Sequence, residues 1–586
     1  MNTGRAKAQA TDCGHLAVNP ITCSEMPLFN FQKSNDPTAR EHIFSGLCLF
    51  ALSLLIGTAI LNNAIWIHQY PGDFSGMDEE HHLLRGLLVH DALWGIDATG
   101  VFNPDIYWPT RWPPLVYLTS AITMQLFGRS QPVMTMTISI FLAALLLFTY
   151  GIGSRLKSPA AGLAAAALLA YWPFLLRYSR YYTLDLTLAA CCAAAVYFLM
   201  ASENFKKPWA CVGFGLSLGL GLLAKIVFPM IVAPPLLALL IINRKEITRR
   251  AWVHLLMSLL IALSISAFWY GPRMGEIFNE FYYHISDYYP AHQPFEAEQG
   301  GFFLWQTKNE LGTVCWLFLI AALLHGFAWK KLKQEQLLPI YLWLLIPLLL
   351  FAVAPSNISR LAMACLPAAV LVVVLFLWKS PKAWRLTAIP ILAVFFVINL
   401  QALTAWPFPY EVEAAAKTQN TTPPVLELGQ FVDRVGKEFS AGTPVNICFF
   451  QAADYQPKLG AEQMWFAFKL KYPPVRFHGY DRFTSPYSGF RRYVACLKQP
   501  GVSIFWTDQP DQVWPDERAV RRVVDLAPLH APQPGPGLMR AGFPLNYNFF
   551  DFPASPPPSA AMIFKGSIAT PPAWKMTPQY IYVYRN

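Results

Sequence analysis

IFSGLCLFALSLLIGTAILNNAIWI occupies residues 43–67 and contains no Asp, Glu, Lys or Arg. A helix needs about 20 mostly apolar residues to cross the roughly 30 Å hydrocarbon layer of a membrane, so this run predicts a transmembrane helix. The whole chain of 586 residues follows the same tendency. It is 54% hydrophobic and 14% charged, whereas a soluble globular chain has about 25% charged residues. The composition therefore predicts an α-helical, polytopic membrane protein.

Further apolar runs follow the first one along the chain. With it they make eleven predicted spans, at residues 43–67, 131–154, 158–176, 186–202, 208–224, 226–243, 251–272, 311–329, 337–359, 361–378 and 386–405. A twelfth uncharged run, at 112–128, includes Pro113 and Pro114 near its start and is short for a span. Its length favours a helix that lies in the membrane interface.

Basic residues gather in the short connections after the second, fourth, sixth, eighth and tenth spans. Cytoplasmic loops of membrane proteins carry such an excess of Lys and Arg. These basic connections all fall on the same side of the membrane only if the 112–128 run does not cross the membrane. The pattern then predicts a multi-pass protein of the plasma (inner) membrane, with a cytoplasmic N-terminus and an extracytoplasmic tail. This bias explains most of the net charge of +10. The tail has no basic patch with interleaved aromatic residues, so the sequence does not predict nucleic acid binding.

Three domains are expected from this organisation. They are a cytoplasmic segment at 1–42, a transmembrane domain at 43–405 with large outer loops at 68–112 and 273–310, and an extracytoplasmic C-terminal domain at 406–586.

The C-terminal domain is predicted to be an α/β unit. PVNICFF, VSIFWTD and YIYVYR are typical of strands, and VLELGQFVDRVGKEF has helical spacing of its apolar residues. Cys448 and Cys496 could pair, although spacing alone does not establish it. The domain has no catalytic signature, so it could cover the active site, hold an acceptor or serve as a structural cap.

GDFSGMDEEHHLLRGLLVHD, at residues 72–91, has three consecutive acidic residues, Asp78 to Glu80, followed by two histidines, His81 and His82, just after the first span. One interpretation is an interfacial helix whose N-terminus is stabilised by Asp78 and Glu79, an effect of about 0.3–1 kcal/mol. Such a cap explains one or two acids better than the whole cluster, so an acid–base role is favoured. Glu79 and His82 also have the Glu-x-x-His spacing of some metal sites, which is weak in a single copy.

Two other stretches place charges near the outer membrane boundary. LLRYSRYYTLDLTLA, at residues 175–189, contains Arg180 and Asp185, which could form an internal ion pair or contact a substrate. Lys225 is the only charged residue between Lys207 and Arg244. It could be a lysine that reaches out to the membrane surface, or part of an anion site.

Arg111 and Arg360 are also isolated basic residues at predicted outer helix ends. Together with Lys225 they run against the positive-inside tendency. Cations bind phosphate through charge-assisted hydrogen bonds. The three residues therefore favour a site for a lipid phosphate, and the carboxylates on the same face favour transfer from a lipid-linked donor to an acceptor outside the cytoplasm.

Several stretches occur in the order found in a known superfamily. They are Asp78-Glu79, RWPPLVYLTSAITMQLFG, YSRYYTLDLTLA, GLSLGLGLLAKIVFP and SNISRLAMACLPA, and they span about residues 43–378. With them the chain resembles the GT-C superfamily of polyprenyl-phosphate-sugar glycosyltransferases, in the branch of the protein O-mannosyltransferases and lipid A aminoarabinose transferases.

The resemblance implies a multi-span fold and an inverting transfer to a lipid, glycan or protein acceptor. It implies that Asp78 is the general base and that Glu79 supports it. It assigns the donor phosphate to Arg111, Lys225 and Arg360. No cofactor is required, and a divalent metal ion is left open.

The resemblance further implies that Asp185 orients the acceptor or a metal ion, while Arg180 stays a substrate-binding candidate. Two departures affect the basic residues. Relatives often carry Lys directly before the two prolines, where this chain has Trp112 after Arg111, and His81 stands where Arg is common.

The main alternative is a multi-span lipid or glycan transporter or flippase. Such proteins often contain inverted repeats and charges at the membrane midplane. No clear internal repeat occurs here, and the charges gather at the outer boundary, which favours an enzyme. A scaffold without activity is a third alternative, and it would tolerate the loss of Asp78.

Overall fold

The computed structural model describes most of the membrane part of the chain and short pieces of the C-terminal part. The described residues are 39–69, 79–96, 112–283, 313–328, 337–353, 359–381, 386, 390–391, 394, 431–433, 435–437, 446–451, 461–472, 476–480, 496, 501–507, 561–568 and 579–585. The site predictions for Asp78 and Arg111 lie outside these residues, as does most of the eleventh predicted span.

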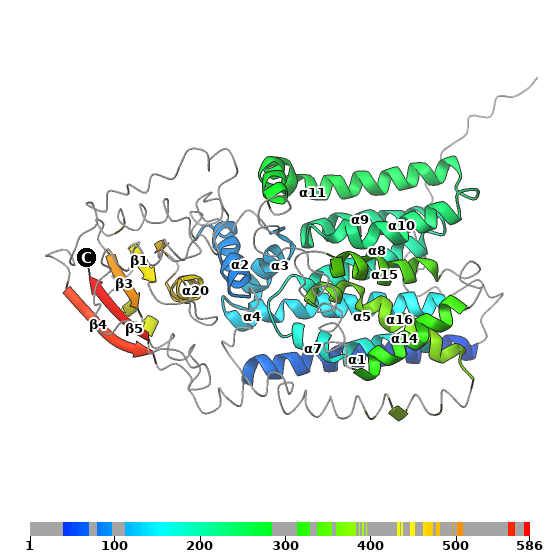
Figure 1. Cartoon of the computed structure of the whole chain (residues 1–586), viewed down its shortest axis with the longest axis horizontal. Helices are drawn as coiled ribbons and strands as arrows, with labels where there is room; N and C mark the ends of the chain where they lie inside the picture. Colours follow the sequence, from blue (N-terminus) through cyan, green and yellow to red (C-terminus); the bar gives the residue numbers. More distant parts are fainter. Residues whose placement is uncertain are drawn as a thin grey trace, which may run out of the picture.

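Helices dominate the described part of the chain up to residue 381 (Figure 1). They are α1 (Ala39–Gln69), α2 (Glu79–Leu93), α3 (Leu115–Phe127), α4 (Gln131–Met136), α5 (Ile138–Leu156), α6 (Pro159–Ala170), α7 (Pro173–Tyr178), α8 (Asp185–Ala201), α9 (Pro208–Ala224), α10 (Phe228–Ile242), α11 (Arg249–Tyr283), α14 (Thr313–Ala328), α15 (Leu338–Val353), the 3₁₀ helix η4 (Ser359–Cys365) and α16 (Leu366–Lys379).

Each of the first ten predicted spans coincides with one or two of these helices. The third span is divided into α6 and α7 because Pro173 disfavours the helical conformation at the residue before it. Trp172 accordingly has an extended backbone, with φ −68° and ψ 125°. The prediction of a polytopic, α-helical membrane fold is confirmed.

Four described helical stretches are long and apolar enough to cross a membrane by themselves, namely Ile43–His68, Gln131–Leu156, Arg249–Gly275 and Ala362–Lys379. Shorter apolar helices lie among them, such as α8 and α9. Large apolar side chains on α1 and α11 are exposed, including Leu47 and Leu263. Such surfaces suit contact with lipid, which solvates apolar side chains.

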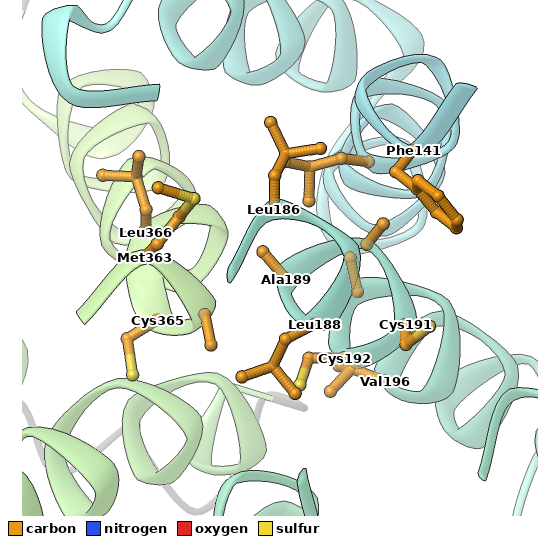
Figure 2. Close-up of a cluster of buried hydrophobic side chains, with 14 of the residues drawn as sticks. Phe141, Leu186, Leu188, Ala189, Cys191, Cys192, Val196, Met363, Cys365 and Leu366 are labelled. Carbon is orange, nitrogen blue, oxygen red and sulfur yellow. The ribbon is translucent and has the colours of Figure 1, made fainter. Parts of the chain in front are cut away.

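Helix α8 lies at the centre of the bundle. It packs against α5, α9 and η4, and nearly all of its side chains are buried. Figure 2 shows Leu186 of α8 between Phe141 of α5 and Leu366 of α16. Helices α9 and α11 approach closely at Gly215, where an added Cβ atom would lie only 2.6 Å from the carbonyl oxygen of Ser258. Small residues permit such approaches between membrane helices.

The C-terminal domain contains a five-stranded sheet with the order β2-β1-β3-β5-β4. The strands are β1 (Asn446–Gln451), β2 (Arg476–Tyr480), β3 (Gly501–Thr507), β4 (Ala561–Ile568) and β5 (Gln579–Arg585). Strand β1 is parallel to β2 and β3, and the β3–β5 and β4–β5 pairs are antiparallel. Helix α20 (Ala461–Lys471) makes the crossover that parallel strands β1 and β2 require.

Three of the strands are those predicted from the sequence, while β2 and β4 were not predicted. Cys448 of β1 and Cys496 form a disulfide. Helix α20 lies between the sheet and α2, so the C-terminal domain meets the membrane part at the end of the bundle where α2 and α3 lie (Figure 1).

Candidate active site

Helix α2 carries the acidic cluster at its start. The predicted helix is present, but it does not lie on a surface with its leucines toward lipid. Leu83, Leu84, Leu87 and Leu88 are at most 5% exposed, because α3 packs on one side of α2 and α20 on another. The cluster therefore begins a helix that is enclosed by protein.

Glu79 is the first residue of α2 and is buried. Its Oε1 atom accepts a hydrogen bond from the backbone N–H of Tyr182, at 2.7 Å. Tyr182 lies in the connection between α7 and α8. The carboxylate thus joins α2 to a segment 103 residues away, which a helix cap does not do.

His82 lies one turn further along the same helix. Its Nδ1 atom is 2.8 Å from the hydroxyl of Tyr117 in α3, and the edge of its ring meets Trp112, with 5.5 Å between ring centroids. Among the described residues, no group of three or more His, Cys, Asp or Glu side chains could hold a metal ion. The Glu-x-x-His pair is thus engaged with Tyr182 and Tyr117 in this arrangement.

A buried cluster of three charged residues forms where α8, α9 and η4 meet. The Nζ atom of Lys225 donates to Oδ1 of Asp185 at 2.7 Å, and Nε of Arg360 lies 3.8 Å from Oδ2 of the same carboxylate. All three residues are less than 9% exposed. One carboxylate thus lies between two cations, and two positive charges are held close together away from water.

The local backbone explains why Lys225 is found there. It caps the C-terminus of α9 in an extended conformation, with φ −161° and ψ 141°, before α10 begins at Phe228. This break between two apolar helices turns the side chain into the protein. The interpretation of Lys225 as a lysine that reaches out to the membrane surface is wrong, because its ammonium group is buried against Asp185.

Arg180 takes a different place from the one that an Arg180–Asp185 ion pair would require. Its guanidinium lies over the ring of Trp66 in α1, 4.3 Å from the ring centroid. Nearby, the side-chain amide of Asn63 donates to the hydroxyl oxygen of Ser179 at 3.0 Å. Arg180 therefore belongs to the contact between α1 and the α7–α8 connection, while Asp185 pairs with Lys225 and Arg360.

Trp112 connects the two halves of the site. Its ring touches His82 of α2 and also lies 6.0 Å from the Nζ atom of Lys225, as in a cation–π contact. The Glu79–Tyr182 hydrogen bond is a second connection, since Tyr182 lies three residues before Asp185. The start of α2 and the buried charge cluster therefore form one site.

Tyr182 also packs against α2 and α3 through its phenol. Its hydroxyl is 2.6 Å from the hydroxyl of Ser120. A Cβ atom at Gly86 would lie 2.6 Å from the same phenol oxygen, so only glycine leaves room for it. Burial raises the pKa of the Tyr182 phenol well above its usual value, although the hydrogen bond with Ser120 opposes part of this shift. The phenol is therefore a neutral partner at this site.

Sequence reasoning missed Trp112, Tyr117 and Tyr182. The available signals were the position of Trp112 directly before Pro113-Pro114 and that of Tyr182 just before Asp185. Single aromatic residues in a chain with 15% aromatics do not stand out.

Known proteins resemble this chain in part of its sequence and in its fold. The sequence profile of the dolichyl-phosphate-mannose-protein mannosyltransferase family matches residues 111–270, a range that contains Arg111, Arg180, Asp185 and Lys225. No curated protein matches the chain.

Solved structures share the fold. ArnT from Cupriavidus metallidurans bound to undecaprenyl phosphate has a TM-score of 0.57 and 12% identity, over 91% of this chain and 97% of that chain. ArnT from the same organism in the apo state has a TM-score of 0.51 and 13% identity, over 78% and 93%. A weaker likeness, with a TM-score of 0.47 and 14% identity over 78% and 69%, is to the archaeal oligosaccharyltransferase AglB from Archaeoglobus fulgidus.

The profile match and the shared fold both test the predicted resemblance to the GT-C superfamily. The profile covers α3 to most of α11, which includes the central helix α8 and two members of the buried charge cluster. The fold likeness to ArnT extends over nearly the whole chain. The match to a mannosyltransferase profile and the ArnT-like fold together confirm the predicted resemblance to the GT-C superfamily of membrane glycosyltransferases.

Proposed function

We propose that the chain transfers a sugar from a polyprenyl-phosphate donor to a hydroxyl or phosphate group of a lipid, glycan or protein acceptor, with inversion at the anomeric carbon. The observation that carries this proposal is the pair of buried cations, Lys225 and Arg360, held on Asp185 and linked to α2 through Trp112. The ArnT structure bound to undecaprenyl phosphate supports the donor class.

The two cations suit the donor phosphate. When the bond between the anomeric carbon and the phosphate oxygen breaks, the electron pair stays on the phosphate, and its negative charge grows. Fixed cations in a site with little water stabilise such charge far better than water does. Lys225 and Arg360 are already oriented, so little rearrangement is needed when the charge develops.

Asp185 has a holding role in this proposal. Without a ligand, it neutralises Lys225 at 2.7 Å and lies 3.8 Å from Arg360, which keeps two like charges together in a buried place. When the donor binds, its phosphate takes over part of this neutralisation. Asp185 then shares the cations with the phosphate.

Asp78 is assigned as the general base by the resemblance to the superfamily. It would take the proton of the acceptor hydroxyl while the acceptor oxygen bonds to the anomeric carbon, and no covalent intermediate with the protein is needed. A positioned base contributes about 10²–10⁴ in rate. Glu79 would orient the start of α2 through its bond to Tyr182, and Arg111 would contact the donor phosphate.

The location follows from the distribution of charge. Basic connections predict a cytoplasmic N-terminus, which places α2, the buried charge cluster and the C-terminal domain on the extracytoplasmic side. Donor and acceptor would therefore meet at the outer face of the membrane.

A transfer assay tests the proposal. Purified protein in lipid vesicles is incubated with polyprenyl-phosphate sugars labelled in the sugar, together with a membrane extract as the source of acceptors. Label should leave the lipid phosphate fraction with the wild-type protein. It should leave much more slowly with Lys225→Met, while Lys207→Met, at an exposed pair with Glu203, should behave as wild type.

Two results would contradict the proposal. Label that stays on the lipid phosphate with every sugar would exclude transfer. Labelled donor that crosses the bilayer without losing its sugar would instead support a flippase.

A further inference from the structure

A second buried charge cluster lies at the other end of α2, where the C-terminal domain meets the membrane part. Asp91 of α2 is completely buried, and Lys469 of α20 is 1% exposed. The Nζ atom of Lys469 lies 3.9 Å from Oδ2 of Asp91. His90 also lies against this carboxylate, with its Nδ1 atom 3.0 Å from Oδ1.

Arg129 lies in the turn between α3 and α4, and its side chain joins α2 to α20. It donates to both oxygens of Asp91, from Nε at 2.9 Å and from Nη2 at 2.8 Å. The same guanidinium donates to the carbonyl oxygens of Lys469, at 2.8 Å, and of Leu470. One side chain from the membrane part thus binds α2 and the last turn of α20 at once.

This contact demands one relative orientation of the two helices. The last carbonyl groups of a helix have no partner within it, and a cation near them is favoured by the helix dipole. Arg129 provides both the hydrogen bonds and the charge. A buried ion cluster adds little net stability, but a wrong alignment would leave a charge without its partner, at a large cost. The cluster therefore favours a single docked arrangement over sliding.

Helix α2 connects this contact to the site. Asp91 follows Glu79 by twelve residues of one helix, or about 18 Å along its axis. Apolar contacts support the same docking, because Phe466 of α20 is buried in the core that contains Leu87 of α2. A change in how α20 holds one end of α2 therefore moves Glu79 and His82 at the other end.

We infer that Arg129 is a positioning residue and that the C-terminal domain, through α20, sets the place of the active-site helix α2. The catalytic part of this inference rests on the proposed function, whereas the structural part does not. The domain is thus a working part of the transferase and not only a cover or a holder of acceptors.

The test combines hydrogen exchange with kinetics on the full chain in detergent. Arg129→Gln should raise amide exchange in the last turn of α20 and also in the first turn of α2, with no change in α8. kcat should fall by about 10²-fold, the effect of small misplacement at a reacting centre, while the Kd for polyprenyl phosphate is unchanged. A fold defect would instead lower donor binding and kcat together.

Two variants make the result specific. Arg129→Lys keeps the charge but not the fork of donors, so its kcat should lie between those of the wild type and Arg129→Gln. If Arg129→Gln does not fold, the exchange and kcat of Arg129→Lys test the positioning role of Arg129 instead. Lys471→Gln removes an ion pair with Asp433 in which both side chains are 50% exposed, and it should change neither exchange nor kcat.

The outcomes separate the two levels of the inference. Unchanged exchange in α2, or raised exchange with normal kcat, would overturn the positioning role of Arg129. If the wild-type protein transfers no sugar at all, the proposed function fails, and the exchange of the first turn of α2 still decides whether Arg129 holds that helix.

Discussion

Asp185→Asn separates the holding role of Asp185 from a direct role in binding. The substitution keeps the shape of the side chain and removes its charge. The carboxylate is 2% exposed and contacts Lys225 at 2.7 Å and Arg360 at 3.8 Å. The variant therefore leaves two buried cations side by side without their counter-ion.

The geometry sets the size of the effect. At an effective dielectric constant of about 20, charges 2.7 Å apart attract by about 6 kcal/mol, and charges 3.8 Å apart by about 4 kcal/mol, before desolvation is subtracted. The carboxylate also costs free energy to bury, which the variant avoids. Breaking a buried ion pair at one partner typically lowers the free energy of unfolding by about 3–5 kcal/mol, and we expect Asp185→Asn to do so.

Donor binding should respond in the opposite direction. If Asp185 only holds the cations, its removal leaves both of them available to a phosphate. Polyprenyl phosphate should then bind Asp185→Asn at least as tightly as the wild type, whereas Lys225→Met should bind it more weakly. A ligand present at 100 times its Kd raises the free energy of unfolding by about 2.7 kcal/mol, so the lipid should restore much of the stability lost in Asp185→Asn.

The assay is denaturant-induced unfolding of the purified protein in detergent, with and without polyprenyl phosphate. Glu203→Gln is the matched control, because it makes the same change in an exposed pair with Lys207 and should lower the free energy of unfolding by less than about 1 kcal/mol. A loss below about 1 kcal/mol in Asp185→Asn would refute the reasoning from burial. Weaker donor binding by that variant would refute the holding role.

Three further predictions concern the site and the topology. Asp78→Asn should lower kcat by about 10²–10⁴-fold with normal donor binding, and Glu79→Gln should cost less, because Gln keeps the oxygen that accepts from Tyr182. If the two variants rank the other way in a transfer assay, the base is Glu79. Gly86→Ala should lower the free energy of unfolding by about 1–3 kcal/mol, since the methyl group meets a phenol oxygen at 2.6 Å, and an unchanged denaturation midpoint would contradict this packing. Reporter fusions after residues 207 and 405 should report opposite sides of the membrane, and the same side for both would overturn the eleven-span topology.

The sequence was sufficient for features that depend on neighbouring residues. A transmembrane helix satisfies its backbone hydrogen bonds within one segment, so a long apolar run such as 43–67 predicts it alone. The strands in PVNICFF and YIYVYR were predicted for a similar reason, because their residue types favour extended backbone. Strand β2, RFHGY, and strand β4, AMIFKGSI, contain Gly and few β-branched residues. Both are edge strands, and each pairs with a single neighbour, β1 or β5.

Lys225 illustrates what the sequence left undecided. Its isolation among apolar residues marked it as unusual. The sequence left open whether Asp185 pairs with Arg180 or contacts a substrate, and whether the lysine reaches the membrane surface or belongs to an anion site. The chain brings Lys225 to Asp185 across 40 residues, because α8 packs against α9 in the bundle. Which cation meets a buried carboxylate depends on how helices pack, and spacing along the chain carries no information about that.

The environment of α2 was likewise decided by tertiary structure. The sequence predicted an interfacial helix here, and the apolar face of such a helix can be buried by lipid or by protein with a similar gain. Helices α3 and α20 cover that face, and Arg129 reaches Lys469 across 340 residues. The sequence by itself determined that α2 would form and bury one side. Only the folded chain decided what covers that side, because burial of apolar surface is non-directional, whereas the ion cluster of Asp91 and Arg129 accepts one arrangement.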